Sequence, residues 1–113
     1  MIMNILTKEK KMIGNDLIGK YVIVRSRAGI FAGTLKELEG QTVVVENSRR
    51  LRYWDGAATL SELSQKGVSR PSDCTFPAEI PIEWLPEVFE IIPCSVEAEK
   101  SIKDVKIWTE HKN

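Results

Sequence analysis

The feature that most constrains the fold is a series of strand-like segments joined by very short connections. Residues 21–24 are β-branched or aromatic, residues 30–39 alternate in the way expected of a long strand, and residues 42–46 read TVVVE. The connections at 25–29 and 40–41 are too short for the crossover that parallel strands require. We therefore predict antiparallel strands arranged as a meander.

Further strand-like segments complete the predicted sheet. Gly33 lies inside the long second strand, where glycine is typical of a bend or a bulge. Residues 50–54 are predicted to form a fourth strand, and residues 82–93 a C-terminal strand that breaks or lies at an edge at Pro86. The expected fold class is α+β: an antiparallel, curved N-terminal β-meander with two short helices and a C-terminal strand.

The two helices carry clear end signals. The pattern TLSE that begins at Thr59 fits a capping box, and Gly67 is the expected left-handed terminator of that helix. Ser95 is the predicted cap of a second helix, at roughly 96–103. The residues expected to point inward from this second helix and its end are Val96, Ile102 and Val105.

Length and composition indicate one globular domain. The 113 residues include 28% charged residues, and the formal net charge is zero. We expect residues 1–16 to form a flexible, lysine-rich N-terminal arm and residues 17–113 to form a single α+β ligand-binding domain. No stretch is apolar and long enough for a signal peptide or a membrane span, and the two cysteines lack metal-ligand spacing. We therefore expect a cytoplasmic protein with no membrane partner, no metal and no cofactor.

The charge is unevenly distributed along the chain. Residues 1–70 hold 12 Lys/Arg against 7 Asp/Glu, whereas residues 71–113 hold 4 against 9. The basic part is where we expect an anionic ligand to bind, although the two parts, or two protomers, could equally attract each other. A chain of this size gains stability from association, so we expect a homo-oligomer, a dimer or larger. The zero net charge makes nucleic acid an unlikely partner.

An arginine- and aromatic-rich run is the strongest functional signal. Arg49, Arg50 and Arg52 precede the aromatic pair Tyr53 and Trp54. Guanidinium groups bind phosphate bidentately and aromatic faces stack on bases, so we predict that these five residues bind a ligand with a phosphate and a base. On a strand, Arg50, Arg52 and Trp54 would share one face. The alternative is a solvated face on which arginines pack against Trp54 by cation–π contact.

Further positions are candidates for the same ligand-binding site. Phe76 lies in a proline-rich loop at 68–81, and we predict that it either covers a pocket or plugs the edge of the sheet. Arg25 and Arg27 lie on a turn, where they either reach the ligand from a neighbouring strand or subunit or are simply exposed. The free N–H groups at the start of the first helix are expected to meet a phosphate.

Signatures of catalysis are missing from the sequence. The single histidine, His111, lies two positions before the C-terminal residue given, which argues against a Ser–His–Asp or Cys–His site. No phosphate-binding loop, dinucleotide-binding motif or metal-ligand cluster occurs. The glutamates between residues 79 and 90 are more simply an acidic surface than an acid/base pair. We expect a protein that is not an enzyme.

Two runs of residues carry a resemblance to a known family. These are RRLRYWDGAATLSEL, which begins at Arg49, and EIIPCSVEAEKSI, which begins at Glu90. With them, residues 22–108 resemble a family of small proteins common in tailed-phage and prophage genomes, a family defined as a domain of unknown function. The chain is also similar to the phage anti-Thoeris sponge proteins. These bind and sequester the cyclic ADP-ribose signals of bacterial TIR defence proteins; some bind the cyclic oligonucleotides of CBASS defence, and they assemble as dimers and larger oligomers.

The resemblance implies a phage anti-defence protein in the cytoplasm of an infected bacterial cell. Its partner would be a small cyclic nucleotide, such as the cyclic ADP-ribose isomer gcADPR or a cyclic oligonucleotide, held without cleavage. The resemblance does not assign binding residues, so the candidates above rest on their chemistry alone. Two other functions stay open: a protein-interaction module that inhibits a host enzyme, and a small single-stranded nucleic-acid binder.

Overall fold

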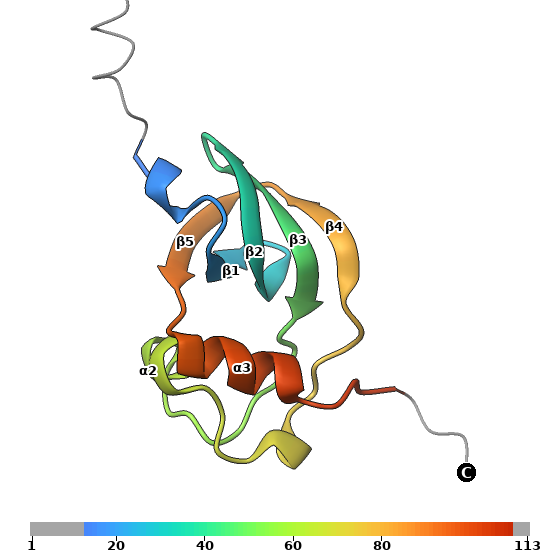
Figure 1. Cartoon of the computed structure of the whole chain (residues 1–113). Coiled ribbons are helices and arrows are strands. Elements are labelled where there is room, and N and C mark those ends of the chain that lie inside the picture. The colour runs from blue at the N-terminus through green and yellow to red at the C-terminus, as the bar shows by residue number, and fades with distance from the viewer. Residues whose placement is uncertain (1–12, 110–113) are drawn as a thin grey trace, which may run out of the picture.

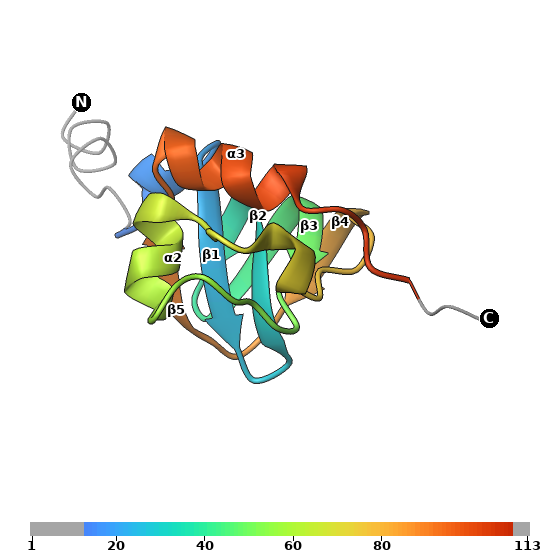
Figure 2. The same cartoon turned by 90° about the horizontal axis from the view of Figure 1, so that it is seen from below.

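The computed structural model describes residues 13–109, which form an α+β fold. Its strands make one antiparallel sheet in the order β4-β3-β2-β1-β5. Helices α2 and α3 lie together at one side of this sheet (Figures 1 and 2). The predicted fold class is therefore confirmed. In chain order the elements are η1 (Asn15–Leu17), β1 (Tyr21–Ser26), β2 (Gly29–Glu39), β3 (Thr42–Arg50), α2 (Leu60–Lys66), η2 (Pro71–Asp73), β4 (Ile80–Leu85), β5 (Val88–Pro93) and α3 (Val96–Asp104).

The first three strands form the predicted meander, with an irregularity at Gly33. The register between β2 and β3 shifts between Ala32 and Thr34 and again between Leu35 and Glu37. A side chain at Gly33 would collide with Val45 on β3. Glycine therefore allows β3 to approach closely at the first bulge, as the sequence predicts.

The segment expected to be one C-terminal strand forms two strands at opposite edges of the sheet. β4 pairs with β3, β5 pairs with β1, and only Pro86 and Glu87 join them. The Val88 N–H donates to the Gln41 carbonyl at 2.8 Å, and the Arg27 N–H donates to the Glu87 carbonyl at 3.3 Å. The link and the first residue of β5 thus contact the β1–β2 turn and the β2–β3 turn. A two-residue link between opposite edges requires a strongly curved sheet, as Figure 1 shows.

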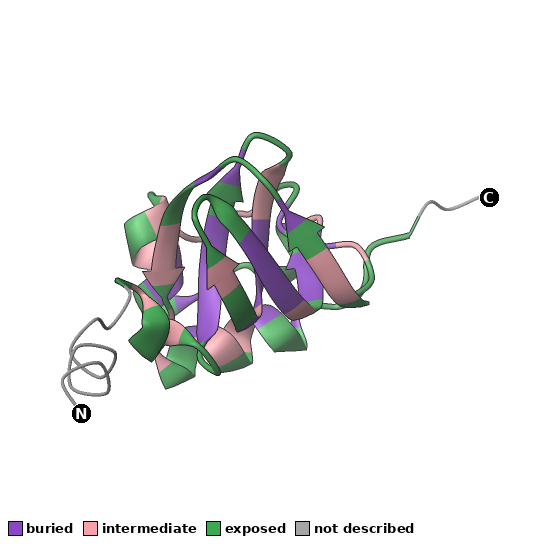
Figure 3. Cartoon of the chain, turned by 90° about the horizontal axis from the view of Figure 1, so that it is seen from above, coloured by how far each residue is buried: buried purple, intermediate pink, exposed green. Residues whose placement is uncertain are grey.

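Both faces of the curved sheet carry buried side chains, so the domain has two apolar cores. On β1, Tyr21 and Ile23 belong to the core beneath the helices, whereas Val22 and Val24 belong to the core inside the curve. Figure 3 shows buried residues concentrated along the strands, with exposed residues at the turns and on the helices. The first core also contains Leu51, Leu63, Phe76, Ile102 and Val105; the second also contains Phe31, Leu35, Val43, Val45, Leu85 and Val88.

The predicted fourth strand at 50–54 is wrong. β3 ends at Arg50, and the following residues make only an isolated bridge between Tyr53 and Thr75. The position beside β3 is occupied by β4, which comes much later in the chain. Residues 51–54 therefore leave the sheet, although Leu51 stays buried and donates its N–H to the Ile30 carbonyl at 2.8 Å.

The ends of the helices follow their capping residues. The Thr59 hydroxyl accepts the Glu62 N–H at 3.1 Å, and α2 ends at Lys66 before Gly67, whose φ is 75°. The Ser95 hydroxyl accepts from the first turn of α3 in the same way. The inward prediction for Val96 is wrong, because its side chain is 85% exposed. It lies six residues before the buried Ile102, roughly 120° away around the helix.

The beginning of the described chain packs against the sheet. Of the arm predicted at 1–16, residues 1–12 lie outside the described residues. The Gly19 N–H donates to the Leu35 carbonyl at 2.7 Å and joins this segment to β2. Among the described residues, no helix has the length and apolarity needed to span a membrane.

Candidate functional site

Arg49 is a structural residue in this fold. Its side chain is buried and donates three hydrogen bonds: Nε to the Pro77 carbonyl at 3.1 Å, Nη1 to the Ile102 carbonyl at 2.8 Å and Nη2 to the Phe76 carbonyl at 3.2 Å. Burial lowers the pKa of Arg49 from its usual value. The predicted phosphate contact does not fit this arrangement, because the guanidinium already joins β3 to the loop before β4 and to the end of α3.

Phe76 occupies the core rather than a pocket surface. Its side chain is fully buried, and the Arg49 guanidinium lies 5.4 Å from the centre of its ring. Of the two alternatives, the structure therefore supports the plug, and Phe76 cannot stack on a ligand base without leaving the core.

Arg25 and Arg27 are paired with carboxylates along β5 and its preceding link. Arg25 Nε lies 3.1 Å from Glu90 Oε1, and its guanidinium lies 5.0 Å from the ring centre of Phe89. Arg27 Nε lies 3.5 Å from Glu87 Oε1. Neither arginine lines the hollow formed by the other candidates, which is described below.

Three of the predicted residues do come together. Arg50, Arg52 and Trp54 line a surface hollow of about 280 Å³, which we call the arginine hollow. Arg50 is the last residue of β3, and the chain then leaves the sheet. The three side chains therefore lie together without belonging to one strand. The other lining residues are Gly29, Ile30 and Leu51.

The Arg50 guanidinium is oriented by its neighbours but stays accessible. Its Nη1 donates to the Ala28 carbonyl at 2.9 Å, and the group lies 4.4 Å from the ring centre of Phe31. The residue is exposed. A guanidinium has five N–H donors, so most of them are available to an anion.

Arg52 brings in an aromatic residue that the sequence did not assign to the site. Its guanidinium lies 5.6 Å from the ring centre of Trp108, which follows α3. The Trp108 N–H donates to the Phe76 carbonyl at 2.9 Å, so this residue fastens the segment after α3 to the loop before β4. The position of Trp108 beside Arg52 depends on contacts between segments distant in sequence. The only sequence signal for this position is an aromatic residue that follows the second predicted helix.

Arg50 and Arg52 differ from the other surface arginines in their electrostatics. Arg25, Arg27 and Arg70 each form an ion pair, with Glu90, Glu87 and Asp55 respectively. Within residues 13–109, neither Arg50 nor Arg52 has a carboxylate partner. The arginine hollow therefore holds two positive charges that no acidic side chain of the described domain neutralises.

Two other predicted elements of the site lie outside the hollow. Tyr53 is 55% exposed, but it does not line the hollow. The start of α2 does not line the hollow, and two N–H groups there are already bonded: Glu62 Oε1 accepts from the Ala58 N–H at 2.6 Å and the Thr59 hydroxyl accepts from the Glu62 N–H. The expected phosphate contact at this helix start is therefore not supported.

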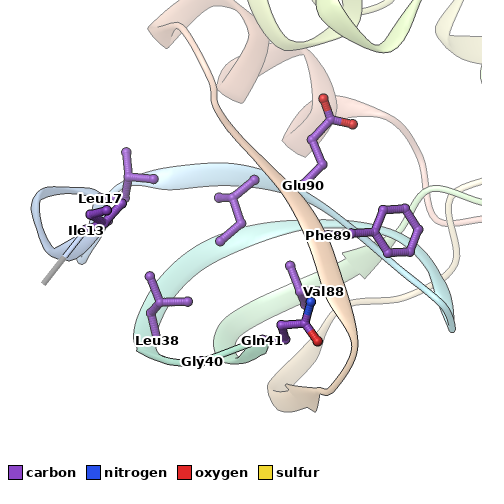
Figure 4. A pocket seen from close by; sticks show the side chains of 10 residues that line it. Ile13, Leu17, Leu38, Gly40, Gln41, Val88, Phe89 and Glu90 are labelled. Atoms are coloured by element: carbon purple, nitrogen blue, oxygen red, sulfur yellow. The ribbon is translucent and has the colours of Figure 1, made fainter.

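A larger hollow, whose lining residues are mostly apolar, lies at the other end of the curved sheet. It measures about 550 Å³ and is bounded by η1, the β2–β3 turn and β5 (Figure 4). We call it the apolar hollow. Its lining residues are Ile13, Gly14, Leu17, Leu38, Gly40, Gln41, Val88, Phe89, Glu90 and Ile91.

The cysteines are structural. Cys74 is buried with its thiol near the Asp55 and Arg70 carbonyls, and burial raises its pKa. Burial, and then the Glu99 charge, raise the pKa of Cys94 to about 12. Among residues 13–109, no group of three or more His, Cys, Asp and Glu is arranged to hold a metal ion.

Comparison with known proteins places the domain in a family. No curated protein matches the chain. The family model described as a domain of unknown function (DUF6948) matches residues 19–102, which run from just before β1 into α3 and include the residues of the arginine hollow. This match covers well over half of the sequence and confirms the predicted membership in a domain-of-unknown-function family. The chain belongs to the DUF6948 family.

Proposed function

We propose that this protein binds a small anionic ligand with a planar base, a compact cyclic nucleotide, in the arginine hollow. The observation that carries the proposal is the pair Arg50 and Arg52, the two surface arginines without a carboxylate partner in the described domain, beside the indole of Trp54. Arginine forks recognise phosphate, and an indole face stacks on a base of any identity.

The size of the hollow favours a compact ligand over a polymer. Its volume of about 280 Å³ lies just below the range for ligand sites, roughly 300–1,000 Å³. A nucleotide whose phosphate and base lie close together can meet Arg50, Arg52 and Trp54 at once. A longer nucleic acid would need a continuous basic groove, and the zero net charge of the chain gives no support for one.

The chemistry of the hollow suits retention without turnover. Arginine stays protonated at all ordinary pH values, and an indole neither accepts nor donates a proton under these conditions. These groups supply charge and stacking, and neither is a general base or a nucleophile. We therefore propose that the ligand leaves unchanged.

The biological role that we propose is sequestration of a defence signal. It rests on the resemblance to the anti-Thoeris sponge proteins, for which the ligand would be a cyclic ADP-ribose isomer such as gcADPR, or a cyclic oligonucleotide. In this proposal a phage protein, assembled as a homo-oligomer in the cytoplasm of the infected cell, lowers the free concentration of the signal. The two uncompensated arginines suit such phosphate-containing ligands.

A second candidate is an interaction module that inhibits a host enzyme. It is favoured by the edge strand β4, on which Trp84 is 63% exposed and Ile80 is 46% exposed. Exposed aromatic residues on an unpaired strand edge are typical of protein-binding surfaces. In this alternative the contacts would be made at β4, and the arginine hollow would be dispensable.

A thermal-shift screen with cyclic nucleotides separates the two candidates. At a free ligand concentration of about 100 times Kd, binding adds about 2.7 kcal/mol to the free energy of unfolding. That gain raises the Tm of a domain of this size by roughly 10 °C or more. No shift with any nucleotide, together with loss of a co-purifying host enzyme on Trp84→Ser substitution, would favour the interaction module.

Two variants test the site itself. Arg52→Gln should weaken binding by roughly 10- to 100-fold, since a hydrogen bond to a charged group contributes about 1.5–3 kcal/mol. Arg27→Gln is the matched control, because Arg27 is exposed and lies outside the hollow. Equal affinities for the two variants would contradict the assignment of the hollow as the site.

A further inference from the structure

The apolar hollow presents apolar side chains to the surface. Ile13 is 97% exposed, and its side chain lies with those of Leu17 and Leu38 around the same concavity, whereas the Phe89 ring points away from it (Figure 4). Contiguous exposed apolar surface is unusual in a small domain and marks a place where another segment or molecule packs. We therefore expect another segment or molecule to cover the apolar hollow.

We propose that residues 1–12 of the same chain cover the apolar hollow. The chain enters the described domain at Ile13, which is itself a lining residue. The preceding sequence, MIMNILTKEKKM, places apolar residues in its first half and lysines in its second. A segment of this composition, attached to the lining residue Ile13, can supply apolar side chains to the hollow.

The length of the segment is sufficient for it to fold back. Leu6 lies seven residues before Ile13, and an extended chain covers at most about 3.3–3.6 Å per residue, so the span is up to roughly 25 Å. A hollow of about 550 Å³ is roughly 10 Å across if it is taken as a sphere. Ile5 and Leu6 can therefore return to the hollow with several residues left for a turn.

The lysines of residues 1–12 are opposite in charge to two glutamates near the hollow. Lys8, Lys10 and Lys11 follow the apolar residues, so they would pass the rim of the hollow when Ile5 and Leu6 occupy it. Two glutamates lie near the hollow: Glu90 is a lining residue, and Glu39 precedes the lining residue Gly40. Within the described residues Glu39 forms no ion pair, whereas Glu90 is paired with Arg25. Sequence patterns alone predict an arm in solvent, and the hollow offers the apolar part of that arm a place to pack.

Photo-crosslinking in the full-length chain tests this placement. A photoreactive phenylalanine analogue replaces Ile5, the protein is irradiated at low concentration, and the adducts are mapped by peptide mass spectrometry. We expect adducts to residues 37–41 or 88–91 within a single chain. The same analogue at Ile107, an apolar residue that is 57% exposed and does not line the hollow, is the control and should give no such adduct. Adducts only at the mass of two chains, only to another protein, or at none of these residues would overturn the proposal.

A stability measurement gives an independent readout. The double substitution Ile5→Asp and Leu6→Asp should lower the Tm by about 4 °C or more, because apolar burial is lost and each kcal/mol shifts Tm by roughly 4–8 °C. Val96→Asp, at a position 85% exposed on α3, is the matched control and should change the Tm by less than about 2 °C. An unchanged Tm in the double variant would contradict the docking.

Discussion

Replacing Arg49 by methionine should destabilise the domain strongly. The guanidinium donates hydrogen bonds to the carbonyls of Phe76, Pro77 and Ile102, and methionine can donate none. Leaving one buried acceptor unpaired costs about 1–3 kcal/mol. The three contacts are not independent, and methionine refills part of the volume, so we expect a loss of about 3–5 kcal/mol, similar to the loss when one partner of a buried charged contact is removed.

This loss is a large part of the stability of a small domain. The free energy of unfolding of a single domain is about 5–15 kcal/mol in total. Since each kcal/mol shifts the Tm by roughly 4–8 °C, Arg49→Met should lower the Tm by at least about 12 °C. Arg50→Met is the matched control, since Arg50 is the next residue but is exposed and makes one exposed hydrogen bond. We expect this control to lose less than about 1 kcal/mol.

Urea denaturation followed by far-ultraviolet circular dichroism measures both variants. Arg49→Met should move the midpoint to a lower urea concentration with an unchanged m-value, which reports a change in stability rather than in the unfolding reaction. The reasoning is refuted if Arg49→Met stays within about 1 kcal/mol of the parent protein. It is also refuted if the variant keeps its stability and loses nucleotide binding, because Arg49 would then contact the ligand as the sequence alone predicts.

Three further predictions concern Gly33, Tyr21 and the thiols. Gly33→Ala should cost about 1–3 kcal/mol, measured by the same denaturation, because the added methyl group meets Val45 on the adjacent strand; an unchanged midpoint would show that β3 moves away freely. The Tyr21 hydroxyl is buried without a hydrogen-bond partner among the described residues, so Tyr21→Phe should be neutral or stabilising near pH 7, and a clear loss would point to a partner for that hydroxyl. Burial raises the pKa of Tyr21, so the folded state binds more protons than the unfolded state above about pH 10; stability should fall as the pH rises through that range, and less so in Tyr21→Phe. The raised pKa values of Cys74 and Cys94 predict slow reaction of both thiols with a disulfide reagent at pH 8, and rapid labelling of the folded protein would contradict their assignment as structural residues.

The parts of the fold predicted from sequence are those that depend on local physics. The alternation along β2, the bulge at Gly33 and the caps Thr59 and Ser95 all express preferences of a few neighbouring residues. The antiparallel arrangement of the first three strands follows from connections too short for any other. These predictions needed no knowledge of distant contacts.

The predictions that failed depend on which distant segments meet. Residues 50–54 have the composition of a strand, but β4 takes the place beside β3, and nothing near Arg50 indicates this. Arg49 and Arg50 look alike in sequence, yet one is enclosed by carbonyls from a later loop and from α3. The pairing of Arg25 with Glu90 likewise follows only from the adjacency of β1 and β5. The sequence therefore identified the types of residue in the candidate site, and the tertiary contacts determine which of those residues lie together.

The most direct test of the proposed function is mass spectrometry of the small molecule retained by the protein. The purified chain is incubated with cyclic ADP-ribose isomers and cyclic oligonucleotides, unbound ligand is removed, and the retained molecule is released by denaturation. We expect an intact cyclic nucleotide from the parent protein and from Arg27→Gln, and little from Arg52→Gln. Recovery of a cleaved nucleotide, equal retention by Arg52→Gln, or no retained nucleotide from the parent protein would contradict the proposed function.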